Sequence, residues 1–109
     1  MTELLAQKKC VACEGWETPL NKIEAEVLLK QVPGWELDAD AKNISRKFKF
    51  KDFAQALAFT NKVGAIAESE GHHPDIELGW GRVAITLTTH AIKGLSENDF
   101  IVAAKIDEL

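Results

Sequence analysis

The sequence predicts an α+β fold, in which a four-stranded antiparallel sheet carries three helices on one face in the order α-β-β-α-β-β-α. Segments with the two-residue alternation of strands come in two pairs, and a short turn can join each pair into a hairpin. Segments with helical spacing precede, separate and follow these pairs. This arrangement favours helices on one side of an antiparallel sheet. The length of 109 residues allows one such domain.

A capping box predicts the start of the first helix. Asn21 and Glu24 have the spacing at which each side chain accepts a hydrogen bond from the other residue's backbone N–H. The helix ends before Pro33-Gly34, because proline cannot continue a helix. Residues 1–19 form an N-terminal arm, and residues 20–109 form the single domain. The apolar face of the helix is expected to comprise Ile23, Val27 and Leu28.

Alternating residues predict the two hairpins. Residues 44–50 alternate between a largely apolar face and a lysine-rich face, and they pair with a short strand that begins at Trp35. Residues 76–80 and 83–87 repeat the alternation on either side of a turn. We expect Trp35 and Trp80 to be core residues. Because an open sheet of four strands has two edges that can pair with another chain, we expect a homodimer or homotetramer.

Capping residues also predict the second and third helices. Asp52 precedes a helix over 53–69, and Ser96 and Asp99 have capping-box spacing at the start of a last helix over 100–106. The inward stripe of the second helix is expected to comprise Phe53, Leu57, Thr60, Val63 and Ala67.

Composition excludes several classes of protein. Hydrophobic residues make up 46% and charged residues 28%, as in globular rather than disordered chains. A net charge of −4 provides no basic surface for direct binding of nucleic acid. No apolar run approaches the roughly 20 residues of a transmembrane helix. Residues 1–9 lack the apolar stretch of a secretory signal, so we expect a cytoplasmic protein without a membrane partner.

The two cysteines, Cys10 and Cys13, form a C-x-x-C pair in the arm. A structural zinc site takes four ligands, so one pair cannot complete it. A thioredoxin-like site requires a preceding strand and a following helix, whereas residues 14–19 are typical of a loop. We expect no catalytic role for this pair, and a metal shared between subunits is the alternative.

The three histidines all lie between His72 and His90. His72 and His73 follow a predicted helix and precede Pro74, which restricts the backbone of His73, and His90 ends a predicted core strand. Imidazole exchanges protons near neutral pH, so the set suggests acid–base chemistry. Taken singly, each is more typical of a solvated loop or a core residue. Zinc is less favoured, because adjacent histidines rarely bind one ion and no spaced histidine pair is present.

Several motifs together resemble a known family, the pterin-4a-carbinolamine dehydratases, and the arm is similar to that of bacterial members. The resemblance covers about residues 19–107. The block E-x-x-x-H-H-P followed by T-H and G-L-S is specific, far more so than a lone glycine motif. The motifs are Pro33-Gly34-Trp35, Phe50-Lys51-Asp52-Phe53, Glu68-Ser69-Glu70-Gly71-His72-His73-Pro74-Asp75, Thr89-His90, Gly94-Leu95-Ser96, Asp99 and Ile106-Asp107.

The resemblance implies a reaction. Members dehydrate 4a-hydroxytetrahydrobiopterin, a pterin-4a-carbinolamine, to quinonoid dihydropterin and water. This step recycles the cofactor of aromatic amino-acid hydroxylases, so a functional link to a pterin-dependent hydroxylase is expected. The dehydratase itself is implied to need no metal and no organic cofactor. Departure of the 4a hydroxyl requires an acid, and N5 requires a base.

The resemblance also assigns the site. His72, His73 and His90 match the catalytic histidines of the family, with His72 and His90 as the proton-transfer pair and His73 as the residue that holds the substrate. The expected substrate-binding residues are Glu68, Thr88, Thr89 and Asp99.

Two of these residues have a second expected role. Glu68, one helical turn before His72, is expected to meet the pterin or to orient that histidine. Asp99 is expected to cap a helix first, with orientation of His90 as its functional role. Animal members often have an aromatic residue near Ile76, and this difference is expected to alter one wall of the pocket.

A non-catalytic protein on the same scaffold is the second hypothesis. Family members are known as dimerisation cofactors of a transcription factor, and dehydratase-like proteins act in carboxysome assembly. A binding, assembly or transcriptional-coactivator protein would depend on its sheet and helix surfaces rather than on its histidines. The complete histidine set favours the enzyme.

Overall fold

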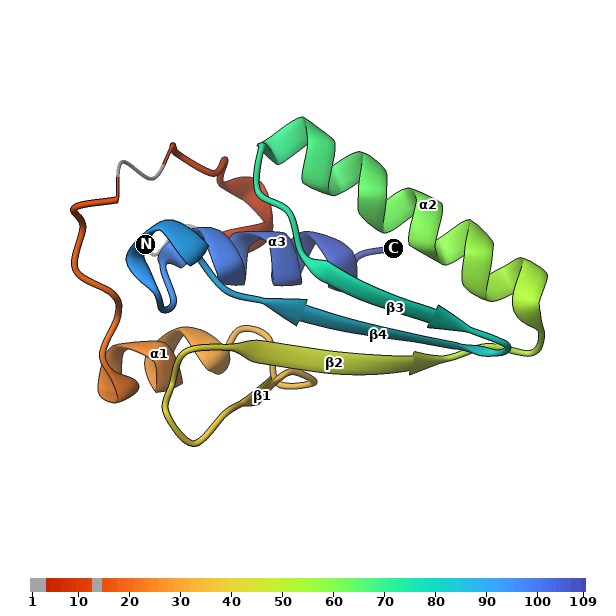
Figure 1. Cartoon of the computed structure of the whole chain (residues 1–109), viewed down its shortest axis with the longest axis horizontal. Coiled ribbons are helices and arrows are strands. Elements are labelled where there is room, and N and C mark those ends of the chain that lie inside the picture. Colours follow the sequence, from red (N-terminus) through yellow and green to blue (C-terminus); the bar gives the residue numbers. More distant parts are fainter. Residues whose placement is uncertain (1–3, 13–14) are drawn as a thin grey trace.

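A computed structural model describes residues 4–12 and 15–109 and confirms the predicted α+β fold. In this part of the chain, three α-helices and a four-stranded antiparallel sheet follow the predicted order (Figure 1). Two 3₁₀ helices, Leu5–Gln7 and His90–Ile92, precede α1 and follow β4. The other elements are α1 (Lys22–Leu29), β1 (Glu36–Leu37), β2 (Ile44–Lys49), α2 (Phe53–Glu70), β3 (Asp75–Gly79), β4 (Arg82–Leu87) and α3 (Glu97–Asp107).

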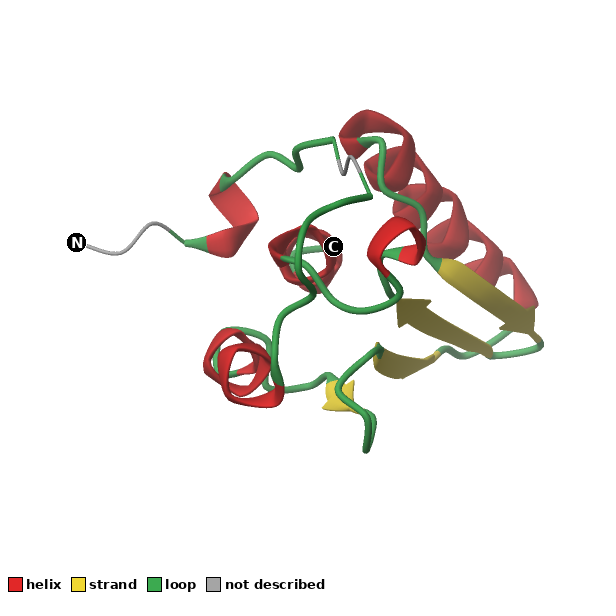
Figure 2. Cartoon of the chain, turned by 60° about the vertical axis from the view of Figure 1, so that its left-hand side comes forward, coloured by secondary structure: helices red, strands yellow, loops and turns green. Residues whose placement is uncertain are grey.

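The sheet has the strand order β1-β2-β4-β3, and all neighbouring strands are antiparallel. Strands β2 and β3 therefore run parallel with β4 between them, and α2 connects them. The helices lie on one side of the sheet (Figure 2). The edge strands are β1 and β3, and pairing of an edge with a second copy stays a prediction. Among the described residues, no helix has both the length and the apolar character needed to cross a bilayer.

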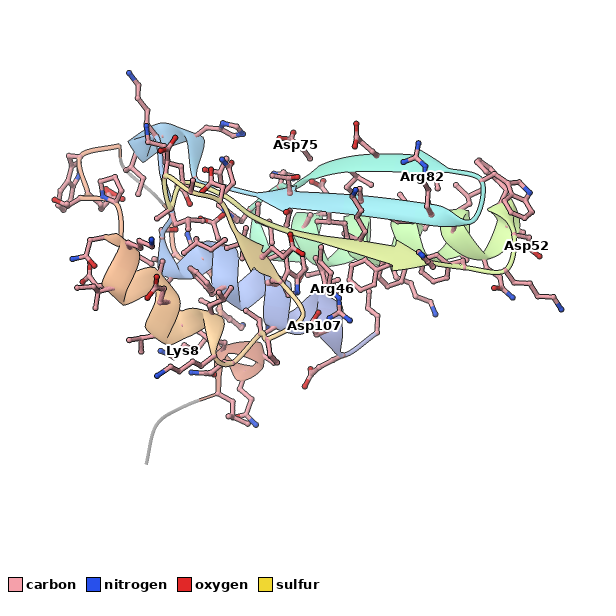
Figure 3. All side chains as sticks on the ribbon, turned by 90° about the horizontal axis from the view of Figure 1, so that it is seen from below. Lys8, Arg46, Asp52, Asp75, Arg82 and Asp107 are labelled. Atoms are coloured by element: carbon pink, nitrogen blue, oxygen red, sulfur yellow. The ribbon has the colours of Figure 1, made fainter. Side chains whose placement is uncertain are left out.

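Strand β4 supplies the centre of the core. Its inward residues Val83, Ile85 and Leu87 are fully buried. The register places Phe48 of β2 opposite Val83, so aromatic and aliphatic side chains share the helix-facing side. The other face is open and polar, and Asp75 and Arg82 project from it (Figure 3). The predicted alternation therefore distinguishes the two faces of the sheet.

The two predicted core tryptophans have different environments. Trp35 is buried, and its Nε1 donates a 2.8 Å hydrogen bond to Oδ1 of Asp107. Arg46 donates to the same oxygen, also at 2.8 Å, and the Arg46 and Asp107 side chains point toward one another (Figure 3). The prediction for Trp80 is wrong, because this side chain is 73% exposed. Trp80 occupies the β3–β4 turn with Gly81, whose φ is +68°, rather than a position in a strand, so the alternation of β3 does not extend to it.

The predicted apolar stripes of α1 and α2 are partly wrong. Phe53 and Leu57, in the first turns of α2, are exposed. These turns extend beyond the end of α3, so none of the helices that the structure describes packs against them (Figure 1). The fully buried positions of these helices are instead mostly small residues, which allow close approach to the core. Larger residues such as Leu28, Phe59 and Ile66 are only partly buried against it. The buried residues are Ala25, Ala56, Val63 and Ala67, whereas Ile23 and Val27 of α1 are exposed.

The N-terminal segment packs into the same core. Leu5 is 2% exposed and belongs to the main apolar cluster, and its 3₁₀ helix contacts α3. Its backbone N–H donates to Oε1 of Gln31 at 3.2 Å. The next carbonyl, that of Ala6, accepts from Nζ of Lys105 at 3.0 Å. The arm is thus fixed to α3 and to the end of α1.

Truncation of the arm's buried leucine tests this packing. We expect Leu5→Ala to lower the free energy of unfolding by about 2–5 kcal/mol, because it leaves a cavity in the core. The neighbouring variant Leu4→Ala is the matched control, since Leu4 is 59% exposed, and its effect should stay within about 0.5 kcal/mol. Urea denaturation measures both, and equal effects would contradict the packing of Leu5.

Candidate functional site

One cavity, of about 410 Å³, brings the histidines together. It lies where the C-terminus of α2, the segment after β4 and the start of α3 meet. Its volume falls in the range of small-molecule sites, roughly 300–1,000 Å³. The cavity is lined by Val11, Ala12, Glu70, Gly71, His72, His73, Thr88, Thr89, His90, Ala91 and Asn98.

The end of α2 sets the directions of the two adjacent histidines. Gly71 ends the helix in the left-handed conformation, with φ at +65°, and the backbone N–H of His72 donates to the Ala67 carbonyl at 3.2 Å. A glycine adopts this conformation without steric cost, which is why it ends helices so often. After this turn His72 contacts a buried partner on α3, whereas His73 remains exposed.

The partner of His72 is Asp99. Nε2 of His72 lies 2.6 Å from Oδ1 of Asp99, whose side chain is 0% exposed. Oδ2 of the same carboxylate accepts from the Thr89 hydroxyl at 2.8 Å and from the backbone N–H of Ser96 at 3.0 Å. An ionised carboxylate only accepts hydrogen bonds, so Nε2 of His72 is the donor. Both oxygens of Asp99 thus have partners other than His90, which we had expected it to orient.

His73 contacts Glu68, one turn back on α2. Its Nε2 forms a hydrogen bond with Oε2 of Glu68, and both side chains are largely exposed. Exposed pairs of this kind contribute little to stability. Glu68 therefore meets His73 rather than His72, and it does not line the cavity. The cause is the turn at Gly71, which directs the two histidines to different partners.

His90 begins a 3₁₀ helix instead of ending the strand, because β4 stops at Leu87. The intervening threonines have hydroxyls that are already bonded. Thr88 lines the cavity, and its hydroxyl donates to the Lys42 carbonyl at 2.6 Å. Thr89 is buried, and its hydroxyl donates to Asp99. His90 is exposed at the rim of the cavity.

Sequence reasoning missed part of the wall. Val11 and Ala12 of the arm, Glu70 and Asn98 all line the cavity. Asn98 had one signal, its place beside Asp99 in the capping sequence, and Glu70 had another, its place inside the motif that contains the adjacent histidines. Val11 and Ala12 had none. The expectation for Ile76 is wrong, because this residue packs against the core cluster and is not part of the cavity wall.

Comparison with known proteins adds the family. Residues 18–109 match the model of the family described as pterin 4 alpha carbinolamine dehydratase. A relative from Halorhodospira halophila, named after this dehydratase, is 52% identical over 105 residues, which cover 96% of each chain. The chain belongs to the pterin-4a-carbinolamine dehydratase family.

Solved structures agree with this family assignment. A Brucella melitensis protein described as a transcriptional coactivator/pterin dehydratase is 34% identical with a TM-score of 0.78. The match covers 84% of this chain and 97% of that one. A pterin dehydratase-like protein described as a RuBisCO assembly factor in the α-carboxysome is 30% identical with a TM-score of 0.60, over 69% of this chain and 87% of that one.

In this dehydratase-family chain, Cys10 is half-buried and directly precedes the cavity-lining Val11. Burial, followed by the negative charge of Glu70, raises its pKa from 9.0 to about 12. The thiol therefore stays protonated at neutral pH, whereas nucleophiles and metal ligands require the thiolate. The predicted C-x-x-C partner, Cys13, lies outside the described residues. Among residues 4–12 and 15–109, no group of three or more His, Cys, Asp or Glu is placed to hold a metal.

Alkylation tests the state of Cys10. In a Cys13→Ser variant, Cys10 is the remaining cysteine, and we expect iodoacetamide to modify the folded protein at pH 8 more than about 100-fold slower than the denatured protein. The reason is the raised pKa, which removes nearly all thiolate at that pH, together with burial. Mass spectrometry of timed samples measures the rate. Similar rates in the two states would contradict the burial of this thiol.

Proposed function

We propose that the protein dehydrates 4a-hydroxytetrahydrobiopterin to quinonoid dihydropterin and water by histidine acid–base catalysis. Membership of the dehydratase family supports the reaction. The contact of His72 with the buried carboxylate of Asp99, at the wall of a cavity that also contains His73 and His90, is the single observation that carries the mechanism.

The reaction requires two proton transfers. The C4a–O bond breaks, and the departing hydroxyl takes a proton from an acid and leaves as water. The proton on N5 passes to a base, and the electron pair of the N5–H bond forms the new double bond between N5 and C4a. Atoms and electrons balance without an oxidant or a reductant. Two imidazoles in opposite protonation states supply the acid and the base.

We assign one of these imidazoles to His72. Because Nε2 of His72 donates to Asp99, the other ring nitrogen, Nδ1, is the one left to exchange a proton with the substrate. The carboxylate fixes the tautomer and stabilises the imidazolium that forms when a proton arrives. In this proposal His90, at the exposed rim, is the other proton-transfer residue, and His73 holds the substrate.

The remaining site residues take supporting roles in this proposal. Thr88 contacts the pterin, since it lines the cavity and its oxygen can still accept a hydrogen bond while its proton is on the Lys42 carbonyl. Asp99 is buried and acts through His72, which it contacts, and Thr89 acts through Asp99, to which its hydroxyl donates. Glu68 acts through His73, which it contacts.

Turnover of a chemically prepared 4a-hydroxytetrahydropterin tests the function. We expect the purified protein to accelerate its decay, measured by ultraviolet absorbance. His72→Ala should lower kcat/KM by about 10²–10⁴-fold, because it removes a proton-transfer group. Glu77→Gln is the control, since Glu77 is an exposed residue on the open face of the sheet. Decay no faster than in buffer would overturn the function, and full activity of His72→Ala would overturn the site.

A second substitution tests the role of Asp99 as a positioning residue. Asp99→Asn keeps the shape of the side chain but removes the negative charge beside His72. We expect kcat to fall by about tenfold or more, because orienting hydrogen bonds to a catalytic histidine are worth at least this much. KM should change little, since the substrate does not touch Asp99 in this proposal. A rise in KM at constant kcat, in protein shown to be folded by circular dichroism, would contradict it.

We also propose that the protein works as a homo-oligomer beside a pterin-dependent aromatic amino-acid hydroxylase. The open sheet edges at β1 and β3 support the homo-oligomer. The link to a hydroxylase is supported by the proposed product, quinonoid dihydropterin. A non-catalytic assembly role has one specific support, the similarity to a protein described as an assembly factor. Recovery of one stoichiometric partner, with no acceleration of pterin decay, would favour that role over the enzyme.

A further inference from the structure

The short strand β1 covers only one end of β2. It pairs with Ile44 and Ser45, whereas β4 pairs with β2 along residues 44–49. Figure 1 shows β1 beside the first part of β2. Within the described part of the chain, the neighbours of β2 in the sheet are β1 and β4. Residues 46–49 therefore form an open stretch of strand on the β1 side, which we call the uncovered edge.

The uncovered edge presents backbone hydrogen-bonding groups. In an antiparallel sheet, successive residues direct their N–H and C=O groups to alternate sides. The carbonyl of Asn43 points to the β1 side, where it accepts a 3.1 Å bond from the residue that follows β1. The N–H of Phe50 points to the β4 side, where it donates at 2.8 Å to a carbonyl of the β3–β4 turn. By this alternation, Lys47 and Lys49 direct their backbone groups toward the open side.

The helix side of the uncovered edge has a cavity of about 420 Å³. Its floor is aromatic, because the rings of Phe48 and Phe50 have their centroids 4.7 and 5.0 Å from that of Phe59. All three side chains are only half-buried. The Asp107 carboxylate in the wall is already paired with Arg46 at 2.8 Å. Apolar side chains of a partner strand can therefore enter this cavity and cover the rings.

The opposite face of the uncovered edge is positively charged. The side chains of Lys47 and Lys49 are exposed, and the register places Lys49 directly opposite Arg82, which projects from the open face (Figure 3). Like charges opposite one another on neighbouring strands destabilise a sheet. No ion pair joins either lysine to another described residue. Acidic side chains of a partner would relieve this repulsion.

A second copy of the chain fits the uncovered edge poorly. An antiparallel copy that bonds to the backbone of both Lys47 and Lys49 through its own uncovered edge would place lysine opposite lysine. Such pairs oppose strand pairing, and lysines on edge strands commonly prevent it. The charge of the edge therefore favours a partner of opposite charge.

We propose that the uncovered edge binds an extended acidic segment of another protein, which joins the sheet beside β2 as an additional strand. Backbone hydrogen bonds to Lys47 and Lys49 supply affinity, and alternate side chains supply selectivity. On one face these side chains are acidic and meet the lysines and Arg82, and on the other they are apolar and enter the aromatic cavity. This cavity shares no lining residue with the histidine cavity, so the inference does not depend on the proposed reaction.

Binding of a synthetic peptide tests the proposal. The probe is a short, fluorescently labelled peptide in which glutamate alternates with valine or phenylalanine, and fluorescence anisotropy measures its Kd. The control peptide has the same composition, with all glutamates placed before the apolar residues. We expect the control to bind at least about tenfold more weakly, because its acidic and apolar side chains do not separate onto two faces of a strand. Equal affinity of the two peptides would overturn the proposal.

Charge reversal locates the site. Lys47→Glu combined with Lys49→Glu should weaken binding of the alternating peptide by about tenfold or more, because attraction becomes repulsion. Lys22→Glu combined with Lys62→Glu, at exposed lysines of α1 and α2, is the matched control. It should leave Kd within about twofold at physiological salt, which screens distant charges. Equal effects of the two double variants would assign binding to net charge and overturn the proposal.

Hydrogen exchange of the wild-type protein tests the strand pairing directly. The amides of Lys47 and Lys49 should exchange rapidly in the free protein, and saturation with the alternating peptide should slow them by about tenfold or more. The amide of Phe48, which faces β4, should change little. Unchanged exchange of the two lysine amides in the presence of bound peptide would overturn the proposal. Protection that is already present in the free protein and falls on dilution would assign the edge to a second copy and overturn it as well.

Discussion

The carboxylate of Asp99 joins the three segments that build the site. It is fully buried, and it bonds His72 after α2, Thr89 after β4 and the backbone of Ser96 before α3. A buried charge without partners costs several kcal/mol, so the fold is stable only when these segments meet around it. The same contacts fix the imidazole of His72 at the cavity. Stability and site geometry therefore depend on one group.

The sheet provides the rigid base for this arrangement. β4 is paired on both sides, by β2 and β3, and its inward residues are fully buried, so the segment that follows it, containing Thr88 and His90, starts from a fixed point. α2 spans from β2 to β3 across the same face, which brings its C-terminal end to the end of β4. The arm completes the wall through side chains of α2 and α3 that bond its backbone.

Much of the fold could be predicted from local pattern. The capping box of Asn21 and Glu24 and the cap at Asp52 form as the spacing predicts, and the alternation along β2 and β4 gives the two faces. Prediction failed where burial depends on a distant neighbour. Phe53 and Trp80 fit the apolar periodicity, but both side chains are exposed. Periodicity carries no information about where a neighbouring helix ends.

The sequence by itself determined the fold class, the order of elements and the histidine set, because hydrophobic period, capping residues and residue type are local properties. Only the tertiary structure decided the partners. Asp99 bonds His72 instead of His90, and Glu68 bonds His73, since the left-handed turn at Gly71 sets the direction of each imidazole. The hydrogen bond between His72 and Asp99, which are 27 positions apart, depends on how α2 and α3 pack against each other. The spacing of residues along the chain does not predict that packing.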